Sequence, residues 1–386
     1  MFLAQVRTTP GIRISAVCDL SFERARSIMK RSGWSSEEIG GLEFFNGSCD
    51  LICHGDVEVV VEATGDPVAG VCHALLCIAE RRHVVMVNVE ADVLAGPLLA
   101  RRAAEAGVVY SLAYGDQPAL IVELVDWART CGFEVVCAGK GTKYLPTFHS
   151  STPDTVWQYY GIDAKQAARG GMNAKMFNSF LDGTKSAIEM AAVANAAGLD
   201  PATGGLLFPP CGIDDLAETL KPTGAGGMLS HAGTVEVVSS LSRDGSPVER
   251  DLRWGVYVTF ATSSDYTAHC FDEYGIATDR SGRYAALYRP VHLIGLELGI
   301  SVASVALRGE PTGAPKRFVA DVVAVAKRDL NLGEVIDGEG GSTVWGRLMP
   351  AVDALKADAL PIGLSSCGVL KRHVAEGEIV RRRDIE

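Results

Sequence analysis

Three features that are common in proteins are scarce or missing in this chain of 386 residues. No stretch approaches the roughly 18 consecutive apolar residues of a membrane-spanning helix, so we expect no membrane partner. The ten cysteines include no Cys-x-x-Cys pair, and Cys49 and Cys53, four positions apart, have no second pair at ligand spacing. We therefore expect the reduced thiols of a cytoplasmic protein in place of disulfides or a zinc centre.

Positive charge is also in short supply. The formal net charge is −11, and the one compact basic run is Arg381-Arg382-Arg383 near the end of the sequence. Proteins that bind nucleic acid neutralise phosphates with a basic face, which this composition does not offer. The sequence argues against nucleic acid as the main partner, although a few local lysines suffice to hold a small anionic ligand.

Apolar strands alternate with helices over the first 138 residues. We predict strands at 12–17, 57–61, 83–87 and 108–112, and this alternation is typical of a parallel, doubly wound α/β sheet. Such sheets bind ligands at the carboxyl ends of their strands. Asp19 suits the acid that binds an adenosine ribose, and a turn or helix-capping role is an equally good interpretation. The candidates for cofactor binding that follow strand ends are Asp19, Thr64, Gly65, Asn88 and Glu90.

The glycine-rich turn Gly-x-Gly-x-x-Gly of dinucleotide-binding domains is missing. The sequence begins where the helix after that turn would already be under way. The absent first strand is central in the Rossmann order, so the strands that end at Asp19 and Thr64 would each lose a neighbour. We therefore expect that roughly 30 residues precede Met1 in the natural protein, and that the chain as given binds NADPH weakly.

Polar residues recur at helical spacing between residues 172 and 199, where we predict one long helix. Steps of three and four residues place five side chains on one stripe, among apolar neighbours that suggest burial. A buried charged stripe is costly unless it meets a ligand or is paired, which favours a site. The alternative is an exposed salt-bridged face. The five residues are Lys175, Asn178, Asp182, Lys185 and Glu189.

The region around that helix carries further lysines. Lys140 and Lys143 lie in a glycine-broken segment, which we predict as a loop after a strand at 133–138. Strands at 235–240 and 255–261 are predicted to be joined through a turn at 243–245. We expect an apolar helix at 289–307, whose His292 fits a core residue better than a catalyst. The last seventy residues or so predict short strands and turns.

Several long runs resemble one family of enzymes. They include VVMVNVEADVLAGPLLA, AGKGTKYLP, STPDTVWQYYG and MFNSFLDGTKSAIEMAAVANAAGL. Over nearly its whole length the sequence is similar to 1-deoxy-D-xylulose 5-phosphate reductoisomerase-like oxidoreductases, which are related to homoserine dehydrogenase in their catalytic part. The tail, from AVAKRDLNLGEVIDGEGG to AEGEIVRRRDIE, resembles a SAF domain, a β-clip module. This resemblance implies a Rossmann domain over 1–138, an α+β catalytic and dimerisation domain over 139–310 and a SAF domain over 316–386.

The resemblance also implies an activity. It predicts a homo-oligomeric enzyme that uses NADPH, or else NAD, to isomerise 1-deoxy-D-xylulose 5-phosphate and reduce it to 2-C-methyl-D-erythritol 4-phosphate for isoprenoid precursors. A small phosphorylated, sugar-like substrate is therefore the expected partner. Stabilising the oxyanion formed needs a cation cluster or a metal, so Mg²⁺ or Mn²⁺ is a further candidate cofactor. The catalytic candidates are Lys140, Lys143, Asp182, Lys185 and Glu189.

Two differences from homoserine dehydrogenase argue against a direct transfer of its mechanism. AGKGTKYL stands where homoserine dehydrogenase has an Asn-Gly-Thr loop. Lys185 and then Glu189 stand where the site helix of that enzyme has an Asp and then a Lys. One alternative is an oxidoreductase closer to homoserine dehydrogenase, with another small hydroxy or semialdehyde substrate, because similarity of fold does not separate the two functions. The other is a non-enzymatic, sugar-binding protein that uses the SAF domain.

Overall fold

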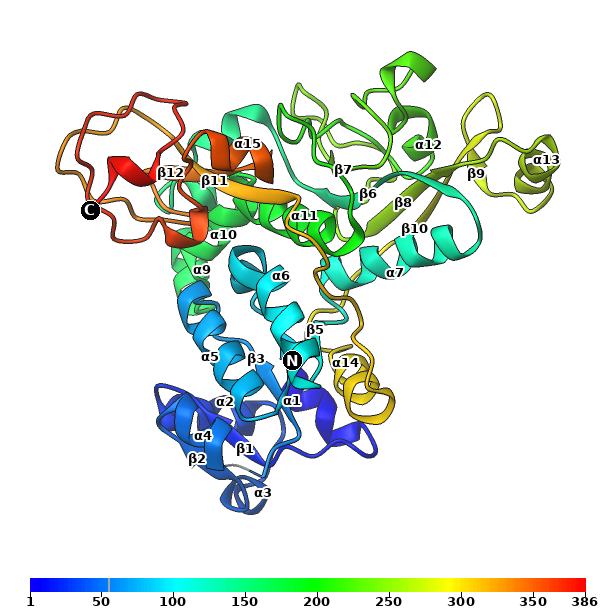
Figure 1. The fold of residues 1–386 in the computed structure, drawn as a ribbon. Helices are drawn as coiled ribbons and strands as arrows, with labels where there is room; N and C mark the ends of the chain where they lie inside the picture. The colour runs from blue at the N-terminus through cyan, green and yellow to red at the C-terminus, as the bar shows by residue number, and fades with distance from the viewer. Residues whose placement is uncertain (55) are drawn as a thin grey trace. The chain divides into compact units, whose positions relative to one another are not determined.

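The computed structural model describes residues 1–54 and 56–386 and divides them into two compact units (Figure 1). Unit 1 contains Met1–Glu123 and His292–Lys316, and unit 2 contains Leu124–Val291 and Arg317–Glu386. The three-domain division implied by the resemblance stays a prediction.

Unit 1 contains parallel strands in two separate sheets. One sheet has β1 (Ala16–Cys18) and β2 (Glu43–Phe45), and the other has the order β3 (Val59–Glu62), β4 (His83–Met86), β5 (Tyr110–Leu112). The parallel pairing confirms the predicted Rossmann-type α/β class. Among the described residues, β1 pairs with β2 alone and β3 with β4 alone. These are the two strands for which the sequence predicted a lost neighbour.

The sheet of β3, β4 and β5 is covered on both faces. Val84 and Met86 pack with α5 and α6, which lie side by side in Figure 1. Val85 points to the opposite face, where it packs with Leu298 and Val305. The helices of this unit are α1 (Phe2–Gln5), α2 (Phe22–Arg31), α3 (Ser36–Gly40), α4 (Ser48–His54), α5 (Pro67–Ala79), α6 (Val89–Ala106) and α14 (Gly299–Ala303), with short 3-10 and π turns at Val6–Thr8 and Ser304–Arg308.

Helix starts in unit 1 follow the capping rules. The Ser21 side chain accepts a hydrogen bond from the backbone N–H of Arg24, and Asp66 caps α5 in the same manner. The predicted helix over 289–307 is wrong in its first half. A strand ends at Arg289, and helical structure begins only at Gly299. In the described part of the chain, no helix is long and apolar enough to cross a membrane.

Unit 2 is built on a mixed five-stranded sheet in the order β7-β6-β8-β10-β9. β7 runs parallel to β6, whereas β8 and β10 are antiparallel to their neighbours. The predicted direct pairing of the 235–240 and 255–261 strands is wrong, because β6 lies between them. The strands are β6 (Glu134–Thr142), β7 (Thr234–Ser239), β8 (Val256–Ala261), β9 (Ala277–Thr278) and β10 (Tyr284–Arg289).

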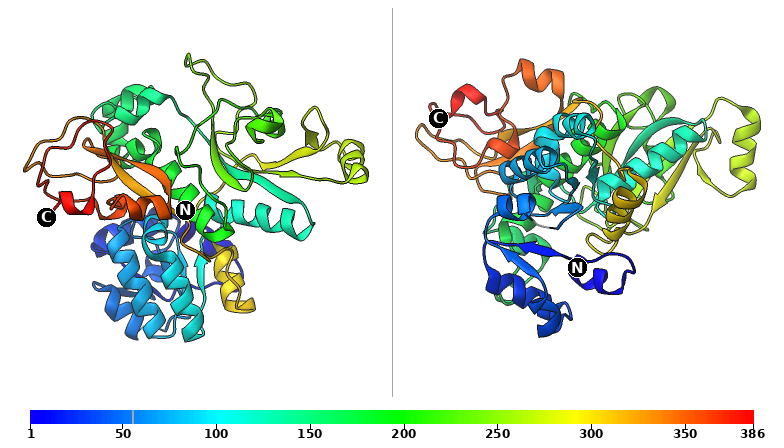
Figure 2. Two further views of the ribbon diagram at one scale, coloured as in Figure 1. Left: turned by 45° about the horizontal axis from the view of Figure 1, so that its top comes forward. Right: turned by 60° about the horizontal axis from the view of Figure 1, so that its bottom comes forward.

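The second layer of unit 2 is a buried helix between two sheets. α11 (Thr184–Ala197) contacts β6 and β7 on one side and the antiparallel pair β11 (Ala320–Ala326) and β12 (Val344–Pro350) on the other (Figure 2). This position explains why all its residues except Lys185 are buried. α7 (Gln117–Thr130) begins in unit 1 and continues into unit 2. The other helices of unit 2 are α8 (Val156–Tyr160), α9 (Ala164–Arg169), α10 (Ala174–Leu181), α12 (Leu216–Thr219), α13 (Asp265–Glu273) and α15 (Ala351–Lys356).

The single long helix predicted over 172–199 is wrong. The chain forms α10 and then α11, separated by Asp182 and Gly183, and Gly183 has the left-handed φ of 90°. A left-handed residue cannot continue a right-handed helix, so the two helices have different axes. The polar stripe that the sequence predicted on one helix is therefore divided between α10 and α11.

Candidate active site

The centre of the candidate site in unit 2 is an ion pair between Lys140 and Glu189. Lys140 lies on β6 and Glu189 on α11, and the ammonium donates a hydrogen bond to Glu189 Oε2. Both residues are buried, with 5% and 3% of their surfaces exposed. Burying two charges is costly, so such a pair is a candidate for function and not simply for stability.

Lys140 lies within a strand and not in the loop that the sequence predicted. The glycines on either side allow this, because neighbouring backbone approaches them closely. A Cβ on Gly139 would lie 1.8 Å from the carbonyl oxygen of Glu236, and one on Gly141 would lie 2.0 Å from that of Leu252. These glycines signal close packing of strands, which is the alternative meaning of glycine in an apolar segment.

Lys185 belongs to the same site by helical spacing. It precedes Glu189 by four residues on α11, so the two side chains occupy one face of the helix. Lys185 is half-buried, whereas the residues around it on this helix are buried. Lys140, Lys185 and Glu189 thus bring two cations and one carboxylate to β6 and the helix that packs against it. Cations of this kind polarise a carbonyl oxygen, and the hydrogen bond to Glu189 positions the Lys140 ammonium.

Asp182 and the residues before it have other partners. Asp182 is buried and pairs with Lys327, and Asn178 is buried and bonded to Ser151 and to the Gly340 carbonyl. Lys175 is exposed and donates to the Asp337 carbonyl. These contacts bind α10 to the C-terminal strands. They favour structural roles for the first half of the predicted stripe.

Lys143 lies just beyond the end of β6. Its ammonium donates to the Tyr159 carbonyl at 2.6 Å and lies 5.6 Å from the centre of the Tyr160 ring. Burial lowers the pKa of Lys143, and the nearby Arg253 lowers it further. Arg253 was not among the sequence candidates, because it lies more than a hundred residues from Lys143 in the chain and only the pairing of β6 with β8 brings the two together.

His149 occupies a different and fully bonded environment. One ring nitrogen is 2.7 Å from the Asp182 carbonyl and the other is 2.9 Å from the Tyr144 hydroxyl, while the ring stacks on Trp345. Burial lowers the pKa of His149, which favours the neutral ring. We assign this histidine to the packing between the mixed sheet and β12.

Unit 1 carries the residues predicted to bind the cofactor. Thr64 and Asn88 follow β3 and β4, and Asn88 Nδ2 reaches Thr64 Oγ1 at 3.4 Å and the Asp66 carbonyl at 2.8 Å. Gly65 has a φ of 74°, and no atom lies within 4 Å of a Cβ built on it. Half-buried Glu90 follows in the first turn of α6. The four residues lie together at the carboxyl ends of parallel strands.

Glu62 is a member of this cluster that the sequence analysis did not select. It is the last residue of β3, and one oxygen accepts hydrogen bonds from Thr64 and contacts His73 at 3.2 Å. The other oxygen is buried without a hydrogen-bond partner among the described residues. A buried orphan acceptor at a strand end fits a ligand that donates hydroxyl or amide hydrogens.

Asp19 follows β1 and accepts a hydrogen bond from the backbone N–H of Ser21 at 2.8 Å through one oxygen. This contact matches the turn role that the sequence left open, and the second oxygen has no hydrogen bond among the described residues. Its place at a strand end agrees with the ribose-binding role as well.

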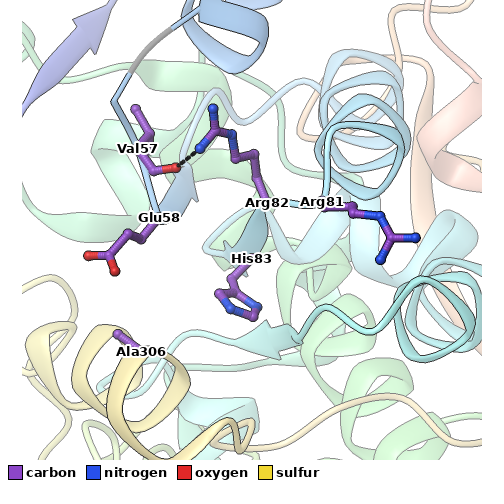
Figure 3. A pocket seen from close by; sticks show the side chains of 6 residues that line it. All are labelled: Val57, Glu58, Arg81, Arg82, His83 and Ala306. Carbon is purple, nitrogen blue, oxygen red and sulfur yellow. Dashed lines mark hydrogen bonds between the residues drawn. The ribbon is translucent and has the colours of Figure 1, made fainter.

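A cavity in unit 1 lies at the edge of the sheet opposite to Thr64 and Asn88. It has a volume of about 240 Å³ and is lined at the amino ends of β3 and β4 (Figure 3). Arg82 donates to the Val57 carbonyl across it at 2.6 Å, and the His83 ring accepts from the Val109 N–H. Ligands of doubly wound sheets bind at the carboxyl ends of the strands. We therefore place the cofactor candidates at the other edge.

The carboxylates considered for a divalent cation do not fit one. Asp182 and Glu189 are each paired with a lysine, and carboxylates that hold Mg²⁺ or Mn²⁺ keep their oxygens for the metal. In the part of the chain that the structure describes, no three His, Cys, Asp or Glu side chains form a group able to hold a metal ion. All ten cysteines are free.

Whole-chain comparisons with known proteins find only distant similarity. No protein of curated function matches the sequence. Solved structures with similar folds include the Bacillus subtilis oxidoreductase yvaA, at 11% identity over 80% of this chain and 85% of that one, with a TM-score of 0.38. A dehydrogenase from Thermotoga maritima is 12% identical over 80% of this chain and 86% of that one, with a TM-score of 0.39. Myo-inositol dehydrogenase from Lactobacillus casei is 12% identical over 40% of this chain and 44% of that one, with a TM-score of 0.28. These values are too low to carry a functional assignment.

The match to a family model is more specific. Residues 115–298 match the model described as "Oxidoreductase DRL, catalytic domain", which covers just under half of the chain. The matched region includes β6, α11 and all five catalytic candidates. The chain therefore contains the catalytic domain of an oxidoreductase.

Proposed function

We propose that this protein is an NAD(P)H-dependent oxidoreductase that isomerises and reduces a small phosphorylated sugar, in the manner of 1-deoxy-D-xylulose 5-phosphate reductoisomerase-like enzymes. The observation that carries the proposal is the oxidoreductase match over 115–298, which contains the buried Lys140–Glu189 pair. Buried charge in a catalytic domain is expected where a reaction develops charge.

The nicotinamide cofactor would bind along the strand ends of unit 1. Glu62, Thr64 and Asn88 offer acceptors and donors there, and the orphan oxygen of Glu62 fits a hydroxyl of the cofactor. When bound, the cofactor supplies the hydride. An acid such as Asp19 binds the unmodified ribose in many NAD enzymes, so both NADPH and NADH belong in the assay.

The residues of unit 2 would act on the substrate. The Lys140 and Lys185 ammonium groups stabilise negative charge that forms on a substrate oxygen, and Glu189 keeps Lys140 in place. Glu189 is also the carboxylate of this group that is able to take up or release a proton. This cluster supplies from side chains the positive charge that a metal would otherwise provide.

The direct test is oxidation of NADPH or NADH, followed by absorbance, with 1-deoxy-D-xylulose 5-phosphate as substrate. Aspartate semialdehyde, the substrate type of the homoserine dehydrogenase alternative, is the comparison. We expect turnover with the sugar phosphate and formation of 2-C-methyl-D-erythritol 4-phosphate. Turnover with the semialdehyde alone would establish the alternative, and binding of sugar phosphates without any oxidation would favour a non-enzymatic role.

A further inference from the structure

We propose that Lys143 and Arg253 together hold the anionic end of the substrate as a two-cation subsite for a phosphate monoester, beside the indole of Trp254. The proposal rests on the proposed function for the identity of the substrate. Lys140 is not part of this subsite, because its ammonium pairs with Glu189.

Strand pairing brings the two cations to one place. In the antiparallel pair, Lys140 of β6 lies opposite Val256 at the start of β8, and the Gly141 N–H donates to the Gly255 carbonyl at 3.1 Å. The residues just beyond these ends, Lys143 and Arg253, therefore extend from adjacent strand ends. The absence of a side chain at Gly141 allows the two segments to approach this closely, because a Cβ there would lie 2.9 Å from the backbone nitrogen of Arg253.

The orientation of each cation is fixed by neutral groups. The Tyr159 carbonyl at the end of α8 and the Tyr160 ring hold the Lys143 ammonium. The Arg253 guanidinium lies 4.7 Å from the centre of the Trp254 ring. Carbonyl and ring contacts position a cation without neutralising it.

In the described part of the chain, the absence of an acidic partner distinguishes Lys143 and Arg253 from the buried lysines of unit 2. Lys140, Lys221 and Lys327 each have a carboxylate partner, at 2.8 Å for Lys221 with Asp279. Among the described residues, no carboxylate forms an ion pair with Lys143 or Arg253. The two cations repel each other, and this is one cause of the lowered pKa of Lys143. An anion bound between them would relieve that repulsion.

A phosphate monoester fits the pair better than a carboxylate. Arginine binds two phosphate oxygens with its planar fork, and lysine adds a point charge on a third. Two positive charges also match the nearly two negative charges of a phosphate monoester at neutral pH, whereas a carboxylate brings only one.

The test measures binding of inorganic phosphate to the full chain without cofactor, by calorimetry and by tryptophan fluorescence. The variants are Lys143→Gln and Arg253→Gln, and Trp254→Phe identifies the fluorescence of the neighbouring indole. Arg250→Gln is the matched control, because Arg250 lies three residues away and pairs with Asp214 on the surface. We expect each subsite variant to weaken phosphate binding at least tenfold, and the control to leave it within about twofold.

Unchanged phosphate binding in both subsite variants overturns the proposal. Equal binding of acetate and phosphate, lost in the same variants, overturns its phosphate preference. The outcome is separable from that of the proposed function, since binding requires no turnover. If the native protein turns over 1-deoxy-D-xylulose 5-phosphate and the variants keep its KM, the subsite is wrong and the function stands. If phosphate binding depends on both cations but no sugar phosphate reacts, the function is wrong and the anion subsite stands.

Discussion

The Lys327 ammonium lies 2.7 Å from Oδ2 of Asp182, and both side chains are buried. The same ammonium donates to the carbonyls of Ser151 and Gly341, each at 2.7 Å. Burial raises the pKa of Asp182, and the charge of Lys327 opposes that rise. One lysine thus binds the junction of α10 and α11 to the C-terminal strands, and this contact gives Asp182 a structural role.

The first prediction concerns this pair. Lys327→Met leaves a buried carboxylate without a partner, so we expect unit 2 to lose about 3 to 5 kcal/mol of unfolding free energy. The double variant Lys327→Met with Asp182→Asn removes both charges and should recover most of that loss. Denaturant unfolding of the single and double variants measures the coupling. A double variant no better than Lys327→Met alone would contradict it.

The second prediction concerns Asp92 on α6. It is buried, one oxygen accepts from the Tyr110 hydroxyl at 2.8 Å, and the other has no partner among the described residues. Burial raises its pKa from 3.8 to about 7, against the effect of that hydrogen bond. A raised folded-state pKa means that the stability from this carboxyl is complete below about 4 and is lost as the pH rises through about 7.

Asp92→Asn should remove that loss. We expect the variant to be more stable than the native chain at pH 8, by on the order of 2 kcal/mol or more, and similar to it near pH 4. Thermal unfolding of both proteins over this pH range provides the comparison. A constant difference between the two curves would mean that Asp92 keeps an ordinary pKa.

The third prediction separates the two halves of the polar stripe. Lys185→Ala should abolish turnover while leaving the fold intact, because Lys185 lies one turn from Glu189 in the candidate site. Lys175→Ala is the control, since Lys175 is exposed on α10 and its ammonium donates to the backbone carbonyl of Asp337. We expect near-normal kcat in the control. Near-normal turnover in Lys185→Ala would remove Lys185 from the site.

The fourth prediction concerns the glycine before Lys140. Gly139→Ala places a Cβ 1.8 Å from the Glu236 carbonyl oxygen, so β6 and β7 must separate. We expect a loss of about 3 kcal/mol or more, together with loss of activity. Gly204→Ala is the control, because no atom lies within 4 Å of its added Cβ. Equal stability of the two variants, measured by urea unfolding, would show that the strands tolerate the methyl group.

The sequence was most informative where local rules act alone. The parallel strands of unit 1 were predicted correctly, since the alternation of strands and helices depends on neighbouring residues. The break at Gly183 was missed, because the apolar spacing continues across it and only the left-handed φ ends the first helix. β2 was missed because a three-residue strand leaves little pattern.

The candidate site was predictable in part. Helical spacing related Lys185 to Glu189, and the same argument included Lys175, which is exposed on a separate helix, since periodicity does not show which neighbour covers a face. Lys327 and Arg253 lie far along the chain from their neighbours in the site, and no local pattern connects them. The glycines beside Lys140 were also misinterpreted. The sequence predicted a loop there, whereas Gly139 and Gly141 allow neighbouring backbone to pack closely against β6.

The division of the unit 1 strands into two separate sheets has a consequence for local unfolding of this unit. A pair of three-residue strands is only marginally stable by itself, so β1 and β2 depend on packing of Ala16, Cys18 and Phe45 into the core beneath β3 and β4. Amide hydrogens of Ala16–Cys18 should then exchange with solvent far sooner than those of His83–Met86, which have strand neighbours on both sides. The slow-exchanging nucleus of unit 1 would be β4, and its first region to unfold would be the segment from β1 to β2.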